Sequence, residues 1–265
     1  MTRSRATHPT KTRNLARVFW LEAKYEFLKN LRLPVYAVST IVFPLMFYVL
    51  FGLMFGSDDA GGVSMATYML ATYGAFGVIG AALFGFGVGV AVERGQGGMR
   101  LKRASPMPPL AYFTAKTAMA LFFSAIVVLC LFALGITVGG VRLGLTQWLG
   151  LFGVLLLGAF PFAAMGLMFG YLVGPNSAPA ILNLVYLPMA FLSGLWVPIQ
   201  ALPDVVQALA PFLPPYHFAQ LALGVLGAGA GGSPWTHAVV LLGFTVVFLF
   251  LAVLLYRRDE GATYG

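Results

Sequence analysis

The run "LGLTQWLGLFGVLLLGAFPFAAMGLMFGYLVGPNSAPAILNLVYLPMAFLSGLWVPIQALP", residues 143–203, contains no Asp, Glu, Lys or Arg over 61 residues. An α-helix rises about 1.5 Å per residue, so about 20 apolar residues cross the hydrocarbon core of a bilayer. The run is therefore long enough for two crossings. Further intervals lack the same charged residues and are each long enough for at least one crossing: 33–57, 60–92, 117–141 and 205–256.

The class of protein follows from these runs. Backbone polar groups in lipid must bond within their own segment, and none of the runs shows the alternation of a barrel strand. Composition agrees, with 60% hydrophobic residues, 9% charged residues and a mean hydropathy of +0.88. We therefore predict an all-α polytopic membrane protein with one transmembrane domain, 34–256. Its six helices are expected at 34–56, 66–92, 110–138, 147–172, 178–197 and 234–256.

Basic residues gather on one side of the predicted spans. Fifteen of the sixteen Lys and Arg residues precede the first span, flank the loop 93–109 or follow the last span, and Arg142 alone lies on the other side. By the positive-inside rule, the N-terminus (1–33), the loop and the tail (257–265) are expected in the cytoplasm. Because this arrangement explains the net charge of +8, no nucleic-acid partner is expected.

Two segments outside the spans are unusual. Residues 12–32 mix aromatic and basic side chains, which suits a helix lying along the cytoplasmic face, although a solvated linker fits the same residues. Residues 198–233 are apolar yet hold several prolines, and proline interrupts helices. Non-helical backbone at membrane depth needs shielding by protein or a cavity. We therefore predict one or two short helices in this outer segment that re-enter the outer leaflet.

Three kinds of chemistry find little support in the sequence. A P-loop needs a Gly-Lys dipeptide, and the chain contains none, so we expect no ATPase site and no enzyme. His8, His217 and His237 are scattered over both predicted sides of the membrane, which argues against a metal site. Ion-driven transporters usually carry ionisable residues within their spans, and the six spans hold none at mid-depth. The most polar deep residue, Asn183, is expected either to bond a neighbouring helix or to contact substrate.

Two motifs resemble those of the ABC-2 type transporter permeases, the six-span membrane subunits of bacterial ABC exporters. The first occupies the loop between the second and third spans: Glu93, Arg94, Gly98, Met99, Leu101, Arg103, Ser105, Pro106, Tyr112 and Lys116. The second runs from the fifth span toward the sixth: Asn183, Pro188, Ser193, Gly194, Pro198, Leu202, Pro203, Pro214 and Tyr216. The loop departs from the family pattern, because Met99 stands where leucine is usual and Lys102 takes a leucine's place, with Leu101 one position early.

The resemblance implies a dimer of six-span subunits, built from two copies or with a related permease, bound to two cytoplasmic ABC ATPases. In such a complex ATP and magnesium belong to the ATPase, and this chain binds no cofactor. The loop 93–109 would form a coupling helix on the ATPase, residues 12–32 a connecting helix, and residues 198–233 the re-entrant helices near the outer exit. The expected location is the bacterial inner membrane.

Site residues follow from the same resemblance. Glu93 and the basic residues of the loop are expected to make polar contacts with the ATPase, while Met99, Leu101 and Pro106 pack against it. The basic residues could equally contact lipid headgroups and set the topology. Along the transport path and the re-entrant segment we expect Asn183, Ser193, Gly194, Pro198, Pro203, Phe212, Pro214 and Tyr216.

The expected function is that of a permease subunit in an ATP-driven exporter, moving a lipophilic drug, lipid or lipid-linked glycan outward. The path is apolar and aromatic, although aromatic residues also fill ordinary helix packing; the first span supplies Phe43, Phe47, Tyr48, Phe51 and Phe55. Two alternatives stay open. One is a polysaccharide exporter of the same family, and the other is a stand-alone secondary transporter or channel-like protein that does not use ATP.

Overall fold

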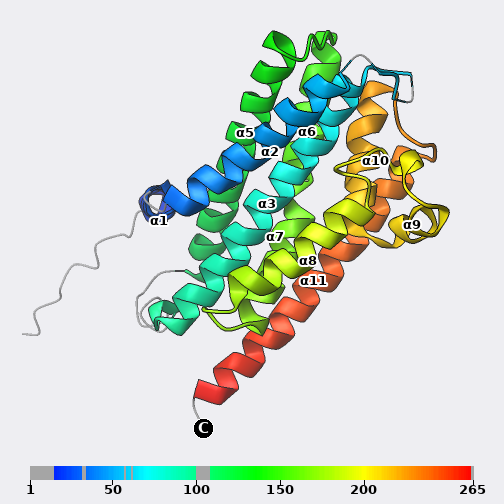
Figure 1. Ribbon diagram of the computed structural model, residues 1–265. Helices are drawn as coiled ribbons and strands as arrows, with labels where there is room; N and C mark the ends of the chain where they lie inside the picture. Colours follow the sequence, from blue (N-terminus) through cyan, green and yellow to red (C-terminus); the bar gives the residue numbers. More distant parts are fainter. Residues whose placement is uncertain (1–14, 32–33, 57, 61, 100–107, 264–265) are drawn as a thin grey trace, which may run out of the picture.

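Helices make up nearly all of the regular structure. The computed structural model describes residues 15–31, 34–56, 58–60, 62–99 and 108–263, and no β-strand occurs within these ranges. The helices, in chain order (Figure 1), are α1 (Leu15–Leu31), α2 (Pro34–Met54), α3 (Met65–Gly95), α5 (Pro109–Thr137), α6 (Leu145–Leu157), α7 (Ala159–Leu172), α8 (Ala178–Leu192), η1 (Ile199–Ala201), α9 (Asp204–Leu209), η2 (Ala210–Phe212), α10 (Pro214–Leu226) and α11 (Pro234–Thr263).

Several of these helices suit a bilayer. Four stretches are long and apolar enough to cross one, namely Met65–Gly95, Leu110–Thr137, Leu145–Leu172 and Pro234–Asp259. Thr40–Gly52 and Ala178–Leu192 are apolar but shorter. The predicted all-α, multi-pass membrane protein is thereby confirmed. The count of six crossings stays a prediction, because it depends on the two shorter helices.

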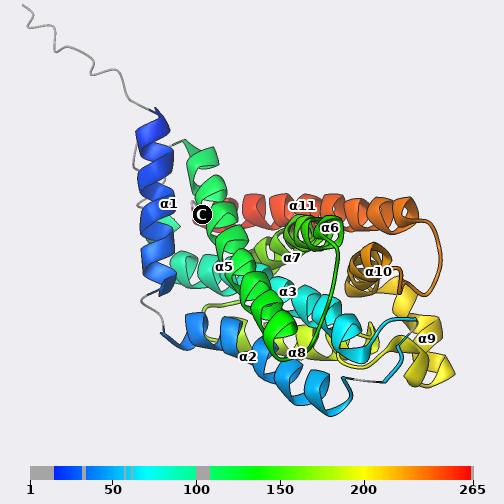
Figure 2. The ribbon, with the colours of Figure 1, turned by 90° about the horizontal axis from the view of Figure 1, so that it is seen from above.

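The central helix is α3, which contacts α2, α5, α7, α8 and α10 (Figures 1 and 2). In its most apolar stretch 78% of the residues are buried, against 11% for α11. Glycines permit the close approach of neighbouring helices. A methyl group on Gly87 would lie 2.6 Å from the Leu182 side chain of α8, and one on Gly166 of α7 would lie 2.6 Å from the Leu83 carbonyl oxygen of α3.

The helix predicted at 147–172 is broken into α6 and α7 at Gly158. Pro161 explains the break, because proline has no N–H to donate to the carbonyl oxygen four residues earlier. A side chain at Gly158 would also collide with α10, since a Cβ there would lie 1.9 Å from the Phe218 ring. The absence of a side chain at Gly158 therefore leaves room for the Phe218 ring of α10.

Other helix ends differ from the predicted ones. Helix α3 continues to Gly95 rather than ending at 92, so Glu93 and Arg94 lie on a helix instead of in a loop. Gly97 then turns the chain at a φ of 75°, a left-handed conformation that glycine adopts readily. Helix α8 ends at Leu192, five residues before the predicted 197, and Gly194 makes the turn at a φ of 75°.

The two unusual segments are both helical where the structure describes them. Helix α1 confirms the helix predicted within 12–32, and it runs across the bundle rather than along it (Figures 1 and 2). The outer segment 198–233 holds η1, α9, η2 and α10, which is more than the one or two short helices predicted. Short helices separated by turns are what its prolines favour.

Candidate functional site

Ionisable side chains gather where α1, α3 and α5 meet. This group, the Lys116 cluster, consists of Glu26, Lys29, Glu93, Tyr112 and Lys116. Lys116 is fully buried (0% exposed), and its Nζ donates to Glu26 Oε1 at 2.6 Å and to Glu93 Oε1 at 3.2 Å. Lys29 Nζ also donates to Glu93 Oε1, and the Tyr112 hydroxyl donates to Glu93 Oε2 at 2.8 Å. Both carboxylates are thus held by groups from other helices.

Helical spacing places the cluster residues of α1 on one face of that helix, and those of α5 on one face of α5. Tyr112 and Lys116 are four residues apart on α5, and Glu26 and Lys29 are three apart on α1, so each pair shares a helix face. The two lysines and two glutamates leave the cluster without net charge. Removing one partner of a buried ion pair leaves an uncompensated charge and costs about 3–5 kcal/mol. The complete cluster therefore fixes α1 against α3 and α5.

Arg94 lies on a different side of α3 from Glu93. Its Nη2 donates to the Val173 carbonyl oxygen at 2.7 Å, and its Nη1 donates to the Tyr171 carbonyl oxygen. Its Nη1 also lies 3.5 Å from Asp259 Oδ1 on α11. The two carbonyls belong to the C-terminal end of α7, where unpaired acceptors and the helix dipole favour a cation. Arg94 therefore ties α3 to α7 and α11.

The loop follows the C-terminal end of α3, which Glu93 and Arg94 bond to neighbouring helices. Gly98 and Met99 follow Gly97, and Met99 packs partly buried against the core. The expected contacts Leu101, Arg103, Ser105 and Pro106 lie outside the described residues. Glu93 was expected to reach toward an ATPase, whereas its carboxylate is directed into the bundle, toward α1 and α5. The structure thus brings Glu93, Tyr112 and Lys116 together, and it directs Arg94 away from them toward α7 and α11.

The residues expected near the outer exit shape the turns between short helices. Pro198 precedes η1, Pro203 precedes α9, and Pro214 begins α10. At Gly194 a Cβ would lie 3.0 Å from that of Ile199, so the turn has little room for a side chain. Tyr216 packs partly buried against the small apolar cluster of this segment. These residues lie in one connected segment at the end of the bundle opposite the Lys116 cluster (Figure 1).

Three other predicted outer residues differ in exposure. Ser193 is buried, and its Oγ has no hydrogen-bond partner within the described part of the chain. Phe212 is 75% exposed. Asn183 is also exposed, and its Nδ2 donates to the Pro179 carbonyl oxygen at 3.0 Å within α8 itself. Asn183 was expected to bond a neighbouring helix or contact substrate, but the bond seen here is local.

Two of the three histidines meet at the end of the bundle opposite the Lys116 cluster. His217 of α10 and His237 of α11 place their Nδ1 atoms 2.9 Å apart, and both rings are buried. The three histidines were described from the sequence as scattered over both predicted sides, and the contact between these two was not predicted. Twenty residues separate them in the sequence, and the turn between α10 and α11 brings them together. His8 lies outside the described residues.

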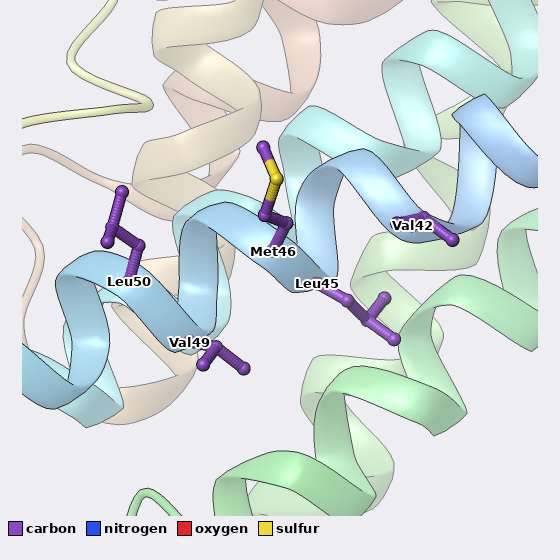
Figure 3. A pocket seen from close by; sticks show the side chains of 5 residues that line it. All are labelled: Val42, Leu45, Met46, Val49 and Leu50. Atoms are coloured by element: carbon purple, nitrogen blue, oxygen red, sulfur yellow. The ribbon is translucent and has the colours of Figure 1, made fainter.

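The aromatic residues of the first span pack mainly against protein. The Phe47 ring stacks on Trp196 with a centroid separation of 5.8 Å, and Tyr48 is buried. This favours the helix-packing interpretation for these two residues. Another face of α2 is apolar and open, where a shallow groove is lined only by aliphatic and methionine side chains (Figure 3): Val42, Leu45, Met46, Val49 and Leu50.

Sequence comparison decides the family. The profile of the ABC-2 type transporter matches residues 17–226, from α1 to the end of α10. The chain belongs to the ABC-2 type transporter family. The match includes both the Lys116 cluster and the outer segment. ABC-2 permeases are membrane transport subunits and are not themselves catalytic.

Two of three similar proteins are named as transport permeases, and the third is named as a nodulation protein. The transport permease YvfS of Bacillus subtilis (strain 168) is 26% identical over 238 residues, which is 89% of this chain and 95% of the relative. The inner membrane transport permease YhhJ of Escherichia coli (strain K12) is 30% identical over 109 residues, 40% of this chain and 29% of that protein. Nodulation protein J of Rhizobium leguminosarum bv. trifolii is 34% identical over 129 residues, 47% of this chain and 49% of that protein.

Sequence reasoning missed part of the ABC-2 permease site. It treated Glu26 and Lys29 as parts of an interfacial helix, and it gave Lys116 a place in the loop motif without a partner. The available signal was spacing, because Glu26 and Lys29 share a face of α1, and Tyr112 and Lys116 share a face of α5. Spacing along each helix does not predict that the face of α1 packs against the face of α5.

Proposed function

We propose that this ABC-2 permease is the membrane subunit of an ATP-driven exporter, powered by a separate cytoplasmic ABC ATPase that docks on loop 93–109 and on α1. Members of the family normally partner with such an ATPase. The substrate class is a lipophilic drug, lipid or lipid-linked glycan, and export of a polysaccharide is the runner-up within the family. The apolar surface of α2 and the aromatic interior behind it support an apolar substrate.

One observation carries this proposal. Glu93 and Arg94 are consecutive residues at the end of α3, and they bond to different sets of helices. Glu93 joins α1 and α5 through the Lys116 cluster, and Arg94 joins α7 and α11. A displacement of the loop that begins at Gln96 is therefore delivered to four helices besides α3. This is the connection that an external motor protein needs.

The proposed mechanism follows from these ties. Closure of the ATPases on ATP shifts the loop, and the loop moves the tied helix ends together. The permease then exchanges inward-open and outward-open or laterally open conformations, because ATP stabilises one of them more than the other. Lys116, Glu26 and Arg94 act as positioning residues, since they transmit the displacement without contacting substrate.

The proposed topology has six crossings, made by α2, α3, α5, α6 with α7, α8 and α11, in a dimer in the bacterial inner membrane. Both termini and the loop lie in the cytoplasm. Helix α8 is only about 22 Å long at 1.5 Å per residue, so its crossing needs the turn at 193–197 as well. Exposed apolar side chains on α9 and η2 support re-entry into the outer leaflet: Val205, Leu209 and Phe212.

A second candidate is a stand-alone transporter driven by an ion gradient. The Lys116 cluster itself favours it, because buried ionisable residues in membrane proteins often mark proton pathways. The two candidates differ in their energy source. Flux driven by a proton gradient through the purified chain alone would support the second candidate and contradict the first.

The experiment that tests the proposal compares coupling in matched variants. The tagged chain is purified from native membranes with its ATPase and placed in nanodiscs, and ATP hydrolysis and retention of the ATPase are measured. We expect Glu26→Gln/Lys116→Met to retain the ATPase but to lower its hydrolysis about tenfold, the effect of roughly 1.4 kcal/mol. Arg142→Met, an exposed basic residue between α5 and α6 and away from the proposed docking surface, serves as the control and should resemble the wild type. Equal ATP hydrolysis in the cluster variant and the control variant would contradict the role of the Lys116 cluster. Purification of the chain without any ABC ATPase would contradict the proposed ATP-driven export.

A further inference from the structure

The contact between His217 and His237 lies at the opposite end of the bundle from the Lys116 cluster. Helix α10 packs along α11 there (Figures 1 and 2), and the two Nδ1 atoms are 2.9 Å apart. The rings are 6% and 8% exposed. The proposed export function assigns no role to this pair.

The hydrogen-bond network fixes which nitrogens carry protons. His217 Nε2 lies 2.8 Å from the Pro211 carbonyl oxygen, which can only accept, so Nε2 carries the hydrogen. In a neutral His217 ring the Nδ1 is then an acceptor. His237 Nδ1 must therefore carry a hydrogen and donate it to His217 Nδ1. The neutral pair is fully compatible with the observed contact.

Within the described residues, no charged side chain forms a hydrogen bond or ion pair with either histidine. The helices against α10 are α11, α6, η2 and the outer half of α3, and their facing stretches contain no Asp, Glu, Lys or Arg. Their remaining titratable side chains are Tyr68 and Tyr73 on α3, with Tyr216 on α10 itself. The nearest acidic residue along the chain, Asp204, is exposed at the start of α9. Burial lowers the pKa of His217, the Pro211 carbonyl raises it, and the neighbouring His237 lowers it.

We propose that the His217–His237 pair is a proton-binding site that holds α10 against α11 at neutral pH and releases it when the outer solution is acid. The first added proton binds the lone pair of His237 Nε2 and leaves the hydrogen bond between the two Nδ1 atoms in place. A second added proton, also taken from the outer solution, places hydrogens on both facing nitrogens. Two like charges 2.9 Å apart then have no acceptor between them, and the contact opens.

The direction of the pH effect follows from the neutral form. Because the closed contact favours neutral rings, its stabilisation is complete above the ordinary histidine pKa of about 6.5 and is lost as the pH falls below that value. Release would loosen α10, which begins at Pro214 in the outer segment. If the export function holds, acid would change the segment expected at the exit. The inference about the contact does not depend on that function.

Hydrogen–deuterium exchange of the full chain in nanodiscs tests the site, at about pH 7.5 and about pH 5, corrected for the intrinsic pH dependence of amide exchange. Each linked proton changes an equilibrium up to about tenfold per pH unit, so corrected exchange of residues 214–226 should rise at least about tenfold at acid pH. Residues 178–192 of α8 serve as the internal reference, and exchange there should stay constant.

Variants separate this pair from other groups. In His237→Gln the amide can donate to a neutral His217 or accept from a protonated one, so the contact survives and the acid response disappears. His8→Gln, outside the pair, keeps the full response and is the matched control. His217→Gln provides a second variant without the response. An acid response of equal size in His237→Gln, or none in the wild type, would overturn the proposal.

Discussion

Among single residues, Lys116 makes the contacts that join α5 to both α1 and α3. It is a fully buried cation between two carboxylates from different helices. From the sequence, Lys116 could be assigned to the first family motif and to the basic residues beside the loop, but not to a buried ion-pair cluster. Lys116 is the seventh residue of the span predicted at 110–138, whereas the other Lys and Arg residues lie outside the predicted spans.

We predict that Lys116→Met lowers the free energy of unfolding by about 3–5 kcal/mol, because Glu26 and Glu93 are left as buried, partly uncompensated charges. Adding Glu26→Gln should restore part of this loss, since the double variant again has no net charge in the cluster. Thermal unfolding in nanodiscs measures both. Additive effects of the two substitutions would show that the side chains do not interact in the folded protein.

At the scale of helices, α3 organises the bundle through close contacts at glycines. The sequence predicted α3 and α5 to within a few residues, because long apolar runs bounded by charge mark their ends. It did not predict the break at Gly158 or the early end of α8. Both depend on contacts between distant segments, namely the Phe218 ring against Gly158 and Ile199 against Gly194.

We predict that Gly166→Leu disrupts the contact between α3 and α7, because a Cβ there would lie 2.6 Å from the Leu83 carbonyl oxygen. Overpacking of this kind costs about 1–3 kcal/mol and more where backbone must move. Gly153→Leu on α6 is the matched control, since no atom lies within 4 Å of a Cβ at that position. Thermal unfolding and folded yield should fall for Gly166→Leu only, and equal behaviour of the two variants would contradict the packing described.

Labelling can establish whether the outer segment enters the membrane. In a Cys130→Ala background, a membrane-impermeant maleimide should react rapidly with Ser233→Cys from outside and much more slowly with Phe212→Cys, although both positions are exposed in the structure. Lipid around Phe212 is the reason for the difference. Equally rapid reaction at the two positions would identify an ordinary aqueous loop.

At the scale of the whole molecule, the chain is a membrane transport subunit whose two ends are built differently. The end that leads into the loop 93–109 is held by ion pairs, and the opposite end is held by short helices and a histidine contact. Class and family could be predicted from apolar runs and two motifs, and the orientation inferred from basic residues stays a prediction. The Lys116 cluster and the histidine pair could not, because each joins residues on different helices whose faces the sequence does not place together.

We propose that an ABC ATPase binds where α3 passes into the loop. The most direct measurement is photo-cross-linking in the native cell from a photoreactive amino acid at Gln96, an exposed position directly after α3. Mass spectrometry identifies the partner, and the same amino acid at Ser233 is the control on the outer side. We predict a cross-link to an ABC ATPase from position 96 and none from position 233. The absence of an ATPase among the products from position 96, in cells that export normally, would contradict the claim.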